Sequence, residues 1–303
     1  MKKCWLALLL AAASALAAAD TWRFAAIGDV PYSERERTEL PKMLDAIAGG
    51  KPAFIAHVGD FKGGTERCDD ALFEQRFRLF DDSPVPFVFV PGDNEWTDCQ
   101  RVTAGAFDPA ERLDKLRSLF WAHRQTLGAK RFPLSRQSGD YPEHTRFRLG
   151  PVLVVTLNLP GGNNNWGPLP WPGAEHQARN DAVLKWVKTS FALARRRKLD
   201  GIVLLFQADP GFKHFSQGLG HRGYRQFLEA LRDETLRFPG QVLAVHGDSH
   251  INRVDRPLRD RTGRVIANFT RLETFGYPLM GWSEVVIDDE APQLFRIDNH
   301  PWK

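Results

Sequence analysis

The sequence predicts an α/β fold, because apolar segments with the character of buried strands alternate with helical segments along most of the chain. Four of the strand-like segments are followed, at once or after one residue, by a Gly-Asp pair. Acidic residues at strand ends are typical of open α/β sheets, which build their sites outside the carboxyl ends of the strands. The chain contains no internal repeat and no evident linker, so residues 20–303 are predicted to form a single domain.

The first half of the chain is predicted to contain three strand–helix units. The strands, which are apolar and rich in β-branched or aromatic residues, are residues 22–27, 53–58 and 87–90. The helices are residues 39–48, 69–80 and 109–124. The second helix carries its large apolar residues near one face. Gly49-Gly50 ends the first helix, and Pro91-Gly92 ends the third strand.

The second half of the chain continues the alternation. The predicted strands are residues 151–158, 201–206 and 241–245, and the predicted helices are residues 174–197 and 223–237. Residues 160–173 are rich in Gly, Asn, Pro and Trp without any period, which predicts a long functional loop. The tail segments, which alternate as antiparallel strands do, are residues 265–269, 284–288 and 293–297.

Residues 1–19 have the composition of a secretory signal peptide. Lys2-Lys3 is followed by an apolar run from Trp5 to Leu16 and by three small residues before Asp20. The apolar run is too short to favour a transmembrane helix, and no later stretch is long enough to span a bilayer. We therefore expect an exported, soluble protein in the periplasm or the extracellular medium.

The charge of the chain does not favour a nucleic-acid or membrane-surface partner. The formal net charge of +4 falls to +2 when Lys2 and Lys3 are removed with the signal peptide. The basic run at residues 195–198 ends a predicted helix, where cations favour the negative end of the helix dipole. A small-molecule partner is expected, and the oligomeric state is left open.

Two cysteines, Cys68 and Cys99, remain after export, and each follows one of the acidic loops. In an oxidising compartment an even pair on neighbouring loops is a disulfide candidate. The alternative is a pair of thiolate metal ligands, but no further cysteine is available to complete a zinc site. The disulfide is the favoured prediction.

The strand-end motifs carry the strongest functional signal. They are Gly28-Asp29, Gly59-Asp60, Gly92-Asp93-Asn94-Glu95 and Gly247-Asp248-Ser249-His250. One such motif is ordinary turn chemistry, whereas four of them after strands of one fold would gather several carboxylates at a sheet edge. Burial and mutual repulsion would destabilise that cluster without a cation, so the sequence predicts a metal site.

The order of these motifs resembles that of the calcineurin-like metallophosphoesterases. That family is known by Asp-x-His, Gly-Asp, Gly-Asn-His-Glu/Asp, a lone His and Gly-His-x-His, all at strand ends around two metals. The resemblance extends from about Trp22 to about Val254. It implies a four-layer α/β/β/α sandwich of two mixed sheets, and a two-metal phosphoesterase that hydrolyses a phosphomonoester or phosphodiester.

The resemblance also implies a set of metal ligands, several of which depart from the family's pattern. Asp29 and Asp60 match the first Asp and the bridging Asp, whereas Pro31 stands where the first His belongs. Asp93 replaces the metal-binding Asn, and Asp248 replaces the first His of the last motif. The implied ligands are Asp29, Tyr32, Asp60, Asp93, Gln207, Asp248 and His250. Such an oxygen-rich set suits Mn, Mg, Ca or Fe better than Zn.

The implied catalytic and substrate-binding residues match the family less closely. Asn94 replaces the His that helps to protonate the leaving group, so a water on the metal, His246 or His57 would have to do so. Both histidines are equally typical of buried structural residues. Arg253 either pairs with a substrate phosphate or faces solvent. Trp96 either stacks on a base or sugar at the rim of the site, or packs within its loop.

Three functions are compatible with these residues. The favoured one is the secreted phosphoesterase. The second is a non-catalytic relative that binds a metal and a ligand. Pro31 and Asn94 favour this alternative because they stand where the family has histidines. The third is a serine hydrolase with Ser249 as nucleophile, because Gly247-Asp248-Ser249 is similar to the Gly-Asp-Ser motif of some esterases. Those enzymes carry the motif after their first strand, whereas here it follows the last α/β unit.

Overall fold

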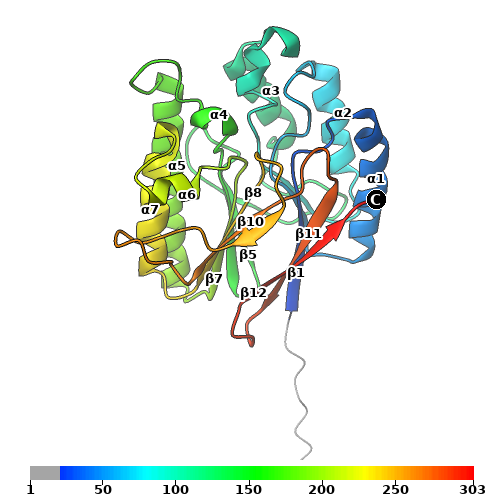
Figure 1. The fold of residues 1–303 in the computed structure, drawn as a ribbon. Helices are drawn as coiled ribbons and strands as arrows, with labels where there is room; N and C mark the ends of the chain where they lie inside the picture. Colours follow the sequence, from blue (N-terminus) through cyan, green and yellow to red (C-terminus); the bar gives the residue numbers. More distant parts are fainter. Residues whose placement is uncertain (1–20) are drawn as a thin grey trace, which may run out of the picture.

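The computed structural model describes residues 21–303, so the predicted signal peptide lies outside the described residues. Two mixed sheets pack face to face, and helices cover both outer faces (Figure 1). This arrangement confirms the predicted four-layer α/β/β/α sandwich. None of the helices in residues 21–303 combines the length and the apolar character that a bilayer crossing requires.

The first sheet has five strands in the order β12-β11-β1-β2-β3. Its strands are β1 (Thr21–Ile27), β2 (Ile55–His57), β3 (Phe87–Phe89), β11 (Gly281–Asp288) and β12 (Phe295–Pro301). Its outer face is covered by α1 (Glu34–Gly49), α2 (Asp70–Asp81) and α3 (Pro109–Phe120). The short turns η1 (Thr97–Gln100) and η2 (Val102–Ala104) follow β3.

The second sheet has seven strands in the order β4-β5-β6-β7-β8-β10-β9. Its strands are β4 (Ser135–Arg136), β5 (Thr145–Leu149), β6 (Val152–Thr156), β7 (Gly201–Leu205), β8 (Gln241–His246), β9 (Arg253–Asp255) and β10 (Phe269–Glu273). Its helices are α4 (Gly161–Asn164), α5 (Ala174–Arg196), α6 (Phe212–Ser216) and α7 (Arg222–Arg237).

Three apolar layers hold the four structural layers together. One lies between the sheets and includes Phe24, Phe54 and Leu243. The other two lie between each sheet and its own helices, and Phe89 and Leu204 belong to them respectively. The central strands are therefore buried on both faces, which explains why their sequences are continuously apolar rather than alternating.

Some predicted elements differ from the structure. Residues 265–269 do not belong to an antiparallel tail, because β10 lies parallel to β8 in the second sheet. The rest of the tail forms β11 and β12, which pair antiparallel beside β1. Helix α1 begins at Glu34, five residues before the predicted start, because the Ser33 hydroxyl caps it by accepting the Glu36 N–H. The short elements β4, β5, β9 and α6 were not predicted.

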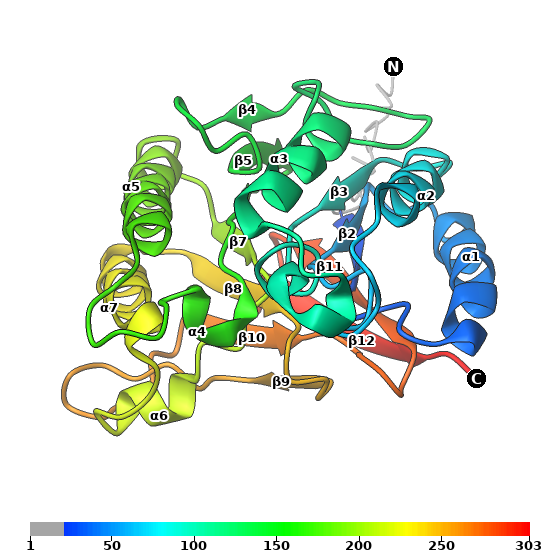
Figure 2. The same cartoon turned by 90° about the horizontal axis from the view of Figure 1, so that it is seen from above.

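The topology brings six strand ends to one edge of the sandwich. Strands β1, β2 and β3 run parallel in the first sheet, and β6, β7 and β8 run parallel in the second. Seen from above, the loops that follow these strands converge in the middle of the molecule, near α4 (Figure 2). This edge carries the predicted site.

Candidate active site

The strand-end carboxylates lie together and are largely withdrawn from solvent. Asp29 and Asp60 have 0% and 3% of their surface exposed, and Asp93 has 8%. Asp29, Asp60 and Asp248 all have left-handed backbone, with φ values of 52°, 61° and 79°. Left-handed conformations are unusual for residues other than Gly and are concentrated at functional sites. Three acidic residues of the converging loops therefore share this unusual backbone conformation.

Asp60 is the point at which groups from both sheets meet. Its Oδ1 atom accepts the Asn94 backbone N–H at 3.0 Å. Its Oδ2 atom accepts the Asn94 amide at 2.9 Å, the Tyr32 hydroxyl at 3.0 Å and the Gln207 amide at 3.2 Å. Burial raises the pKa of Asp60 well above its usual value, and the nearby charges of Asp93 and Glu95 raise it further.

Asp93 and Asp248 face one another across the α-carbon of Gly161. A Cβ atom on Gly161 would lie 2.8 Å from both carboxylate oxygens of Asp93 and 2.8 Å from Oδ1 of Asp248. Burial raises the pKa of each carboxyl group to about 7, and for Asp93 the charge of Asp248 is the second cause. The two carboxylates approach this α-carbon so closely only because residue 161 has no side chain.

Asp29 and His250 form a second polar group beside this space. Both carboxylate oxygens of Asp29 accept the Asp248 backbone N–H, at 3.1 and 3.0 Å. His250 donates its Nδ1–H to the Tyr277 carbonyl at 2.8 Å, which leaves Nε2 facing Oδ1 of Asp29 at 3.5 Å. Hydrogen bonding to Asp29 raises the pKa of His250. A backbone carbonyl that fixes one ring nitrogen is the usual support of a metal-binding histidine.

Tyr32 lies between the two groups. Its hydroxyl donates to Asp60 and accepts the Asn94 amide at 2.9 Å, and it lies 3.5 Å from Oδ1 of Asp29. Burial raises the pKa of Tyr32 well above its usual value, and the charge of Asp60 adds to the increase. Tyr32 therefore keeps its proton and acts in this arrangement as a phenol donor.

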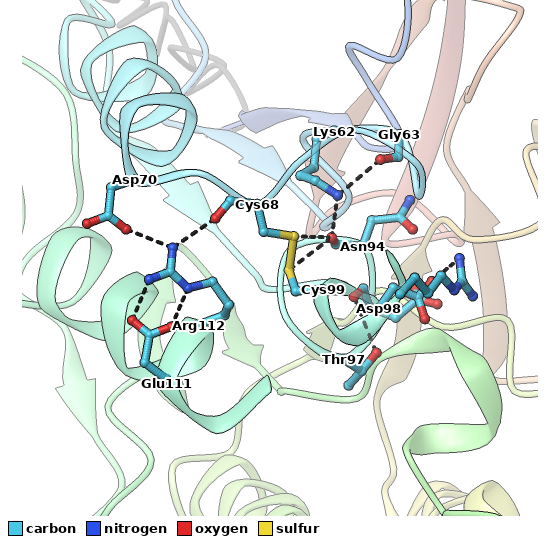
Figure 3. Close-up of a disulfide and its surroundings, with 12 residues drawn as sticks. Lys62, Gly63, Cys68, Asp70, Asn94, Thr97, Asp98, Cys99, Glu111 and Arg112 are labelled. Carbon is cyan, nitrogen blue, oxygen red and sulfur yellow. Dashed lines mark hydrogen bonds and ion pairs between the residues drawn. A yellow bond between two sulfur atoms is a disulfide. The ribbon is translucent and has the colours of Figure 1, made fainter. Parts of the chain in front are cut away.

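The loops after β2 and β3 are cross-linked, as Figure 3 shows. A disulfide joins Cys68 to Cys99, with a Cα–Cα distance of 5.8 Å, which confirms the predicted pair. The buried ammonium of Lys62 donates to the carbonyl oxygens of Asn94 and Gly63, at 2.7 and 3.0 Å. These bonds hold the backbone of Asn94, and through it the two donors that Asn94 directs at Asp60.

The comparison with protein families decides what kind of site this is. Residues 23–252 match the family model for calcineurin-like phosphoesterases. The chain belongs to the calcineurin-like phosphoesterase family. The match covers the six converging strand ends and all the predicted ligands.

Solved structures share the fold of this phosphoesterase-family chain at low sequence identity. A dimetal phosphatase from Danio rerio has a TM-score of 0.56 and 13% identity, over 92% of this chain and 96% of its own. A protein from Thermus thermophilus has a TM-score of 0.51 and 12% identity, over 92% and 99%. A purple acid phosphatase from yellow lupin seeds has a TM-score of 0.50 and 10% identity, over 93% and 54%. Comparison with curated proteins gives no match.

The donor groups of this phosphoesterase-family site fit a hard, oxygen-binding cation. Within residues 21–303 no three His, Cys, Asp or Glu side chains alone are gathered closely enough to hold a metal ion. The site instead mixes carboxylates with the amides of Gln207 and Asn94 and one imidazole. The three carboxylate oxygens of Asp93 and Asp248 that converge beside Gly161 are the donors that such a cation would take.

Neither His57 nor His246 is placed to protonate a leaving group, which corrects the prediction for both. His57 uses both ring nitrogens on backbone atoms, the carbonyl of Val30 at 2.8 Å and the N–H of Gly59 at 3.2 Å. His246 is fully buried and directs Nδ1 at the Gly247 carbonyl. Burial lowers the pKa of each ring to about 4, so both are neutral structural groups.

Trp96, Arg253 and Ser249 also differ from the roles that the sequence suggested. Trp96 is fully buried, 5.2 Å beneath the Arg179 guanidinium, and does not lie on a rim. Arg253 Nη2 lies 2.8 Å from Asp209 and 2.6 Å from Glu273, so carboxylates of the protein already hold it. In the described part of the chain, the Ser249 hydroxyl bonds to Glu273 and Arg253. No imidazole base accompanies it there, which disfavours the serine hydrolase.

Sequence reasoning missed three residues that shape the site, namely Lys62, Gly161 and Arg179. Arg179 is fully buried and donates to the carbonyls of Asn158 and Asn164, at 3.1 and 3.0 Å. It thereby holds the turn that contains Gly161, in which residues 162–165 all have positive φ. The run Gly161-Gly162-Asn163-Asn164-Asn165 was the available signal, because Gly and Asn are the residues that best tolerate this conformation.

Proposed function

We propose that this protein is an exported, divalent-metal-dependent phosphoesterase with a two-metal site, acting on a small phosphomonoester or phosphodiester. Family membership supports phosphoester hydrolysis as the reaction class. The observation that carries the metal dependence is the close approach of the Asp93 and Asp248 carboxylates at Gly161, because three of their oxygens converge there with Asp93 almost fully buried.

The chain offers two groups of ligands. Asp29, Asp60 and His250 would hold one cation. Asp60, Asp93, Gln207 and Asp248 would hold the other. Bound cations would supply Lewis-acid stabilisation of the charge that develops on the phosphoryl group.

The remaining residues orient these ligands and limit the proton chemistry. Asn94 occupies the position of the family's leaving-group acid but has no ionisable proton to give. Its amide and the Tyr32 hydroxyl both donate to Asp60 and fix the direction of that carboxylate. The reaction is therefore expected to favour substrates whose leaving group departs without protonation.

A non-catalytic, ligand-binding relative is the second candidate, and one observation favours it. Asp60 already accepts four hydrogen bonds from Tyr32, Asn94 and Gln207, so protein donors satisfy much of what a bridging cation would otherwise satisfy. The presence of Asn94 in the position of the family's leaving-group acid also favours the non-catalytic relative.

The test combines metal content with turnover. Protein purified without chelators is expected to contain divalent metal, and after chelation Mn, Mg, Ca or Fe is expected to restore aryl phosphate hydrolysis better than Zn. Bound metal without hydrolysis of any phosphoester would favour the non-catalytic relative. Hydrolysis that survives complete metal removal would overturn the metal dependence. Export is tested separately by sequencing the N-terminus of the mature protein, which is expected to begin at Asp20.

A further inference from the structure

A basic pocket lies beside the carboxylate cluster, between α6, β9 and the segment that follows β9. Its volume is about 440 Å³. Five cationic side chains line it, namely Lys213, Arg253, Arg256, Arg259 and Arg271. Only two carboxylates, Asp209 and Asp255, line it with them. In Figure 2 its elements lie next to one another below α4.

Ion pairs within the protein account for only two of the five cations. Arg271 is buried and donates its Nε–H to Asp255 at 2.7 Å. Arg253 is held by Asp209 and by the fully buried Glu273. These two arginines face three carboxylates, those of Asp209, Asp255 and Glu273, so the inner side of the pocket carries no excess positive charge.

The other three cations have no carboxylate within ion-pair distance among the described residues. Arg256 Nη2 donates to the neutral Gln293 amide oxygen at 2.7 Å, and Arg259 Nη1 donates to the Gly263 carbonyl at 3.1 Å. No ion pair involves Lys213 within residues 21–303. Three uncompensated cations around one concavity attract an anion, and a dianionic phosphate with several acceptor oxygens suits arginine forks best.

Asp209 connects this pocket to the candidate site. Its backbone N–H donates to Oδ2 of Asp248 at 2.8 Å, and its carboxylate lines the pocket and accepts from Arg253 at 2.8 Å. One residue therefore separates the predicted metal ligand Asp248 from the basic pocket. The carboxylate cluster and the basic pocket are therefore adjacent, with Asp209 between them.

We propose that the basic pocket binds a second phosphoryl group of the substrate, remote from the one that is hydrolysed. The substrate class is then a small phosphoester that carries two phosphates. This inference rests on the proposed phosphoesterase function. It assigns the pocket to substrate choice and leaves the chemistry to the carboxylate cluster.

The test compares a hexose monophosphate, a hexose bisphosphate and an aryl phosphate. The native protein is expected to hydrolyse the bisphosphate with a kcat/KM at least about tenfold above that of the monophosphate, since charge-assisted hydrogen bonds commonly contribute this much. The double variant R256Q/R259Q is expected to lose that preference through KM, with aryl phosphate turnover within about twofold of native. R264Q, which removes an exposed arginine of the same segment outside the pocket, serves as the matched control.

Binding of the same sugar phosphates, measured by calorimetry on chelated protein, separates the two proposals. If the bisphosphate affinity falls at least about tenfold in R256Q/R259Q but not in R264Q, the pocket binds the second phosphate. This conclusion holds even if no ester is hydrolysed, in which case only the proposed phosphoesterase function fails. Equal bisphosphate affinity in the native protein and in R256Q/R259Q would overturn the proposal that the pocket binds a second phosphate, whatever the turnover of aryl phosphate. A native protein that binds and hydrolyses both sugar phosphates equally well overturns it too.

Discussion

The two sheets hold their site loops in different ways. On the five-stranded side the loops after β2 and β3 are joined covalently by Cys68–Cys99 and by the buried ammonium of Lys62. On the seven-stranded side no disulfide is present among residues 21–303; a left-handed turn pinned by Arg179 and the ion pairs of Arg253 hold the loops. The first side is thus held by a covalent cross-link, whereas the second carries the turn at Gly161 and the basic pocket.

Each side combines residues that match the family's pattern with residues that depart from it. Asp29, Asp60 and Glu95, all on the five-stranded side, match the family's pattern. Glu95 is fully buried and accepts the backbone N–H groups of Gly92 and Asp60, at 2.6 and 3.0 Å. On the seven-stranded side Gln207 and Asp248 stand where histidines are usual. On the five-stranded side Pro31, Asp93 and Asn94 also depart from the family's pattern, so both sheets contribute to the oxygen-rich set of donors.

The largest effect is expected from Asp60→Asn, because Asp60 is the residue that joins the two sides. Asparagine offers one acceptor oxygen where the present carboxylate accepts four hydrogen bonds and would bridge two cations. Metal content and aryl phosphate turnover should fall together, turnover by about 10²–10³-fold. Metal analysis and steady-state kinetics measure both. Asp289→Asn, at an exposed position, is the control, and normal metal binding by Asp60→Asn would show that the family alignment is wrong.

Removal of the disulfide tests the rigidity of the five-stranded side. Cys68 and Cys99 are 31 residues apart, and cross-links of this span stabilise by about 3–4 kcal/mol in the chain-entropy model. The double variant Cys68→Ala/Cys99→Ala should lose about that free energy of unfolding in urea titration, compared with the native protein under non-reducing conditions. Free alkylation of both cysteines in native exported protein would contradict the cross-link.

The seven-stranded side is tested by Gly161→Ala. The added methyl group would lie 2.8 Å from three carboxylate oxygens of Asp93 and Asp248 and would fill the space assigned to a cation. Metal affinity should fall about 10–100-fold, the range found when groups that support a metal site are changed. Gly173→Ala is the matched control, because its Cβ would approach nothing closer than the Trp166 carbonyl at 3.7 Å. Equal metal affinity in the two variants would show that no cation binds beside Gly161.

The sequence was sufficient to predict the α/β alternation, the disulfide and the meeting of the carboxylates from local composition and strand order, and the four layers from the resemblance to the family. The sequence did not predict in which direction individual side chains point or which groups they contact. An apolar strand around His57 shows that the ring is buried, but not that both nitrogens bond to backbone at residues 30 and 59. Arg253 looked available because its partner Glu273 is twenty residues later, on a strand predicted at the wrong position.

The same limit applies to the turn at residues 161–165 and to Trp96. Composition predicted a loop at 160–173, yet only the fold shows that Arg179 of α5 ties this turn to the ring of Trp96. Short strands such as β4 and β9 have too few residues for any period to be detected. Contacts between residues far apart in the chain thus account for most of what the sequence could not show.

The smallest expected effect concerns the leaving group, and it tests whether the five-stranded side lacks an acid. Asn94 cannot donate a proton to a departing alkoxide, so the native protein should hydrolyse aryl phosphates at least about 10²-fold faster than alkyl phosphates, the lower range of general acid catalysis. Asn94→His should narrow that ratio about tenfold by restoring an imidazole at the family's position. Asn94→Gln is the control, since it preserves an amide without supplying an acid.

Equal rates on aryl and alkyl phosphates in the native protein would contradict this expectation and would identify another proton donor. His57 and His246 are not placed for this role, because His57 uses both ring nitrogens on backbone atoms and His246 is fully buried beside the Gly247 carbonyl. Besides a water on the metal and His250, Tyr32 is then a candidate, because its phenol lies among the carboxylates and its raised pKa keeps the proton available for a strongly basic alkoxide. Under that outcome Tyr32→Phe should slow alkyl phosphates selectively and leave aryl phosphates nearly unchanged.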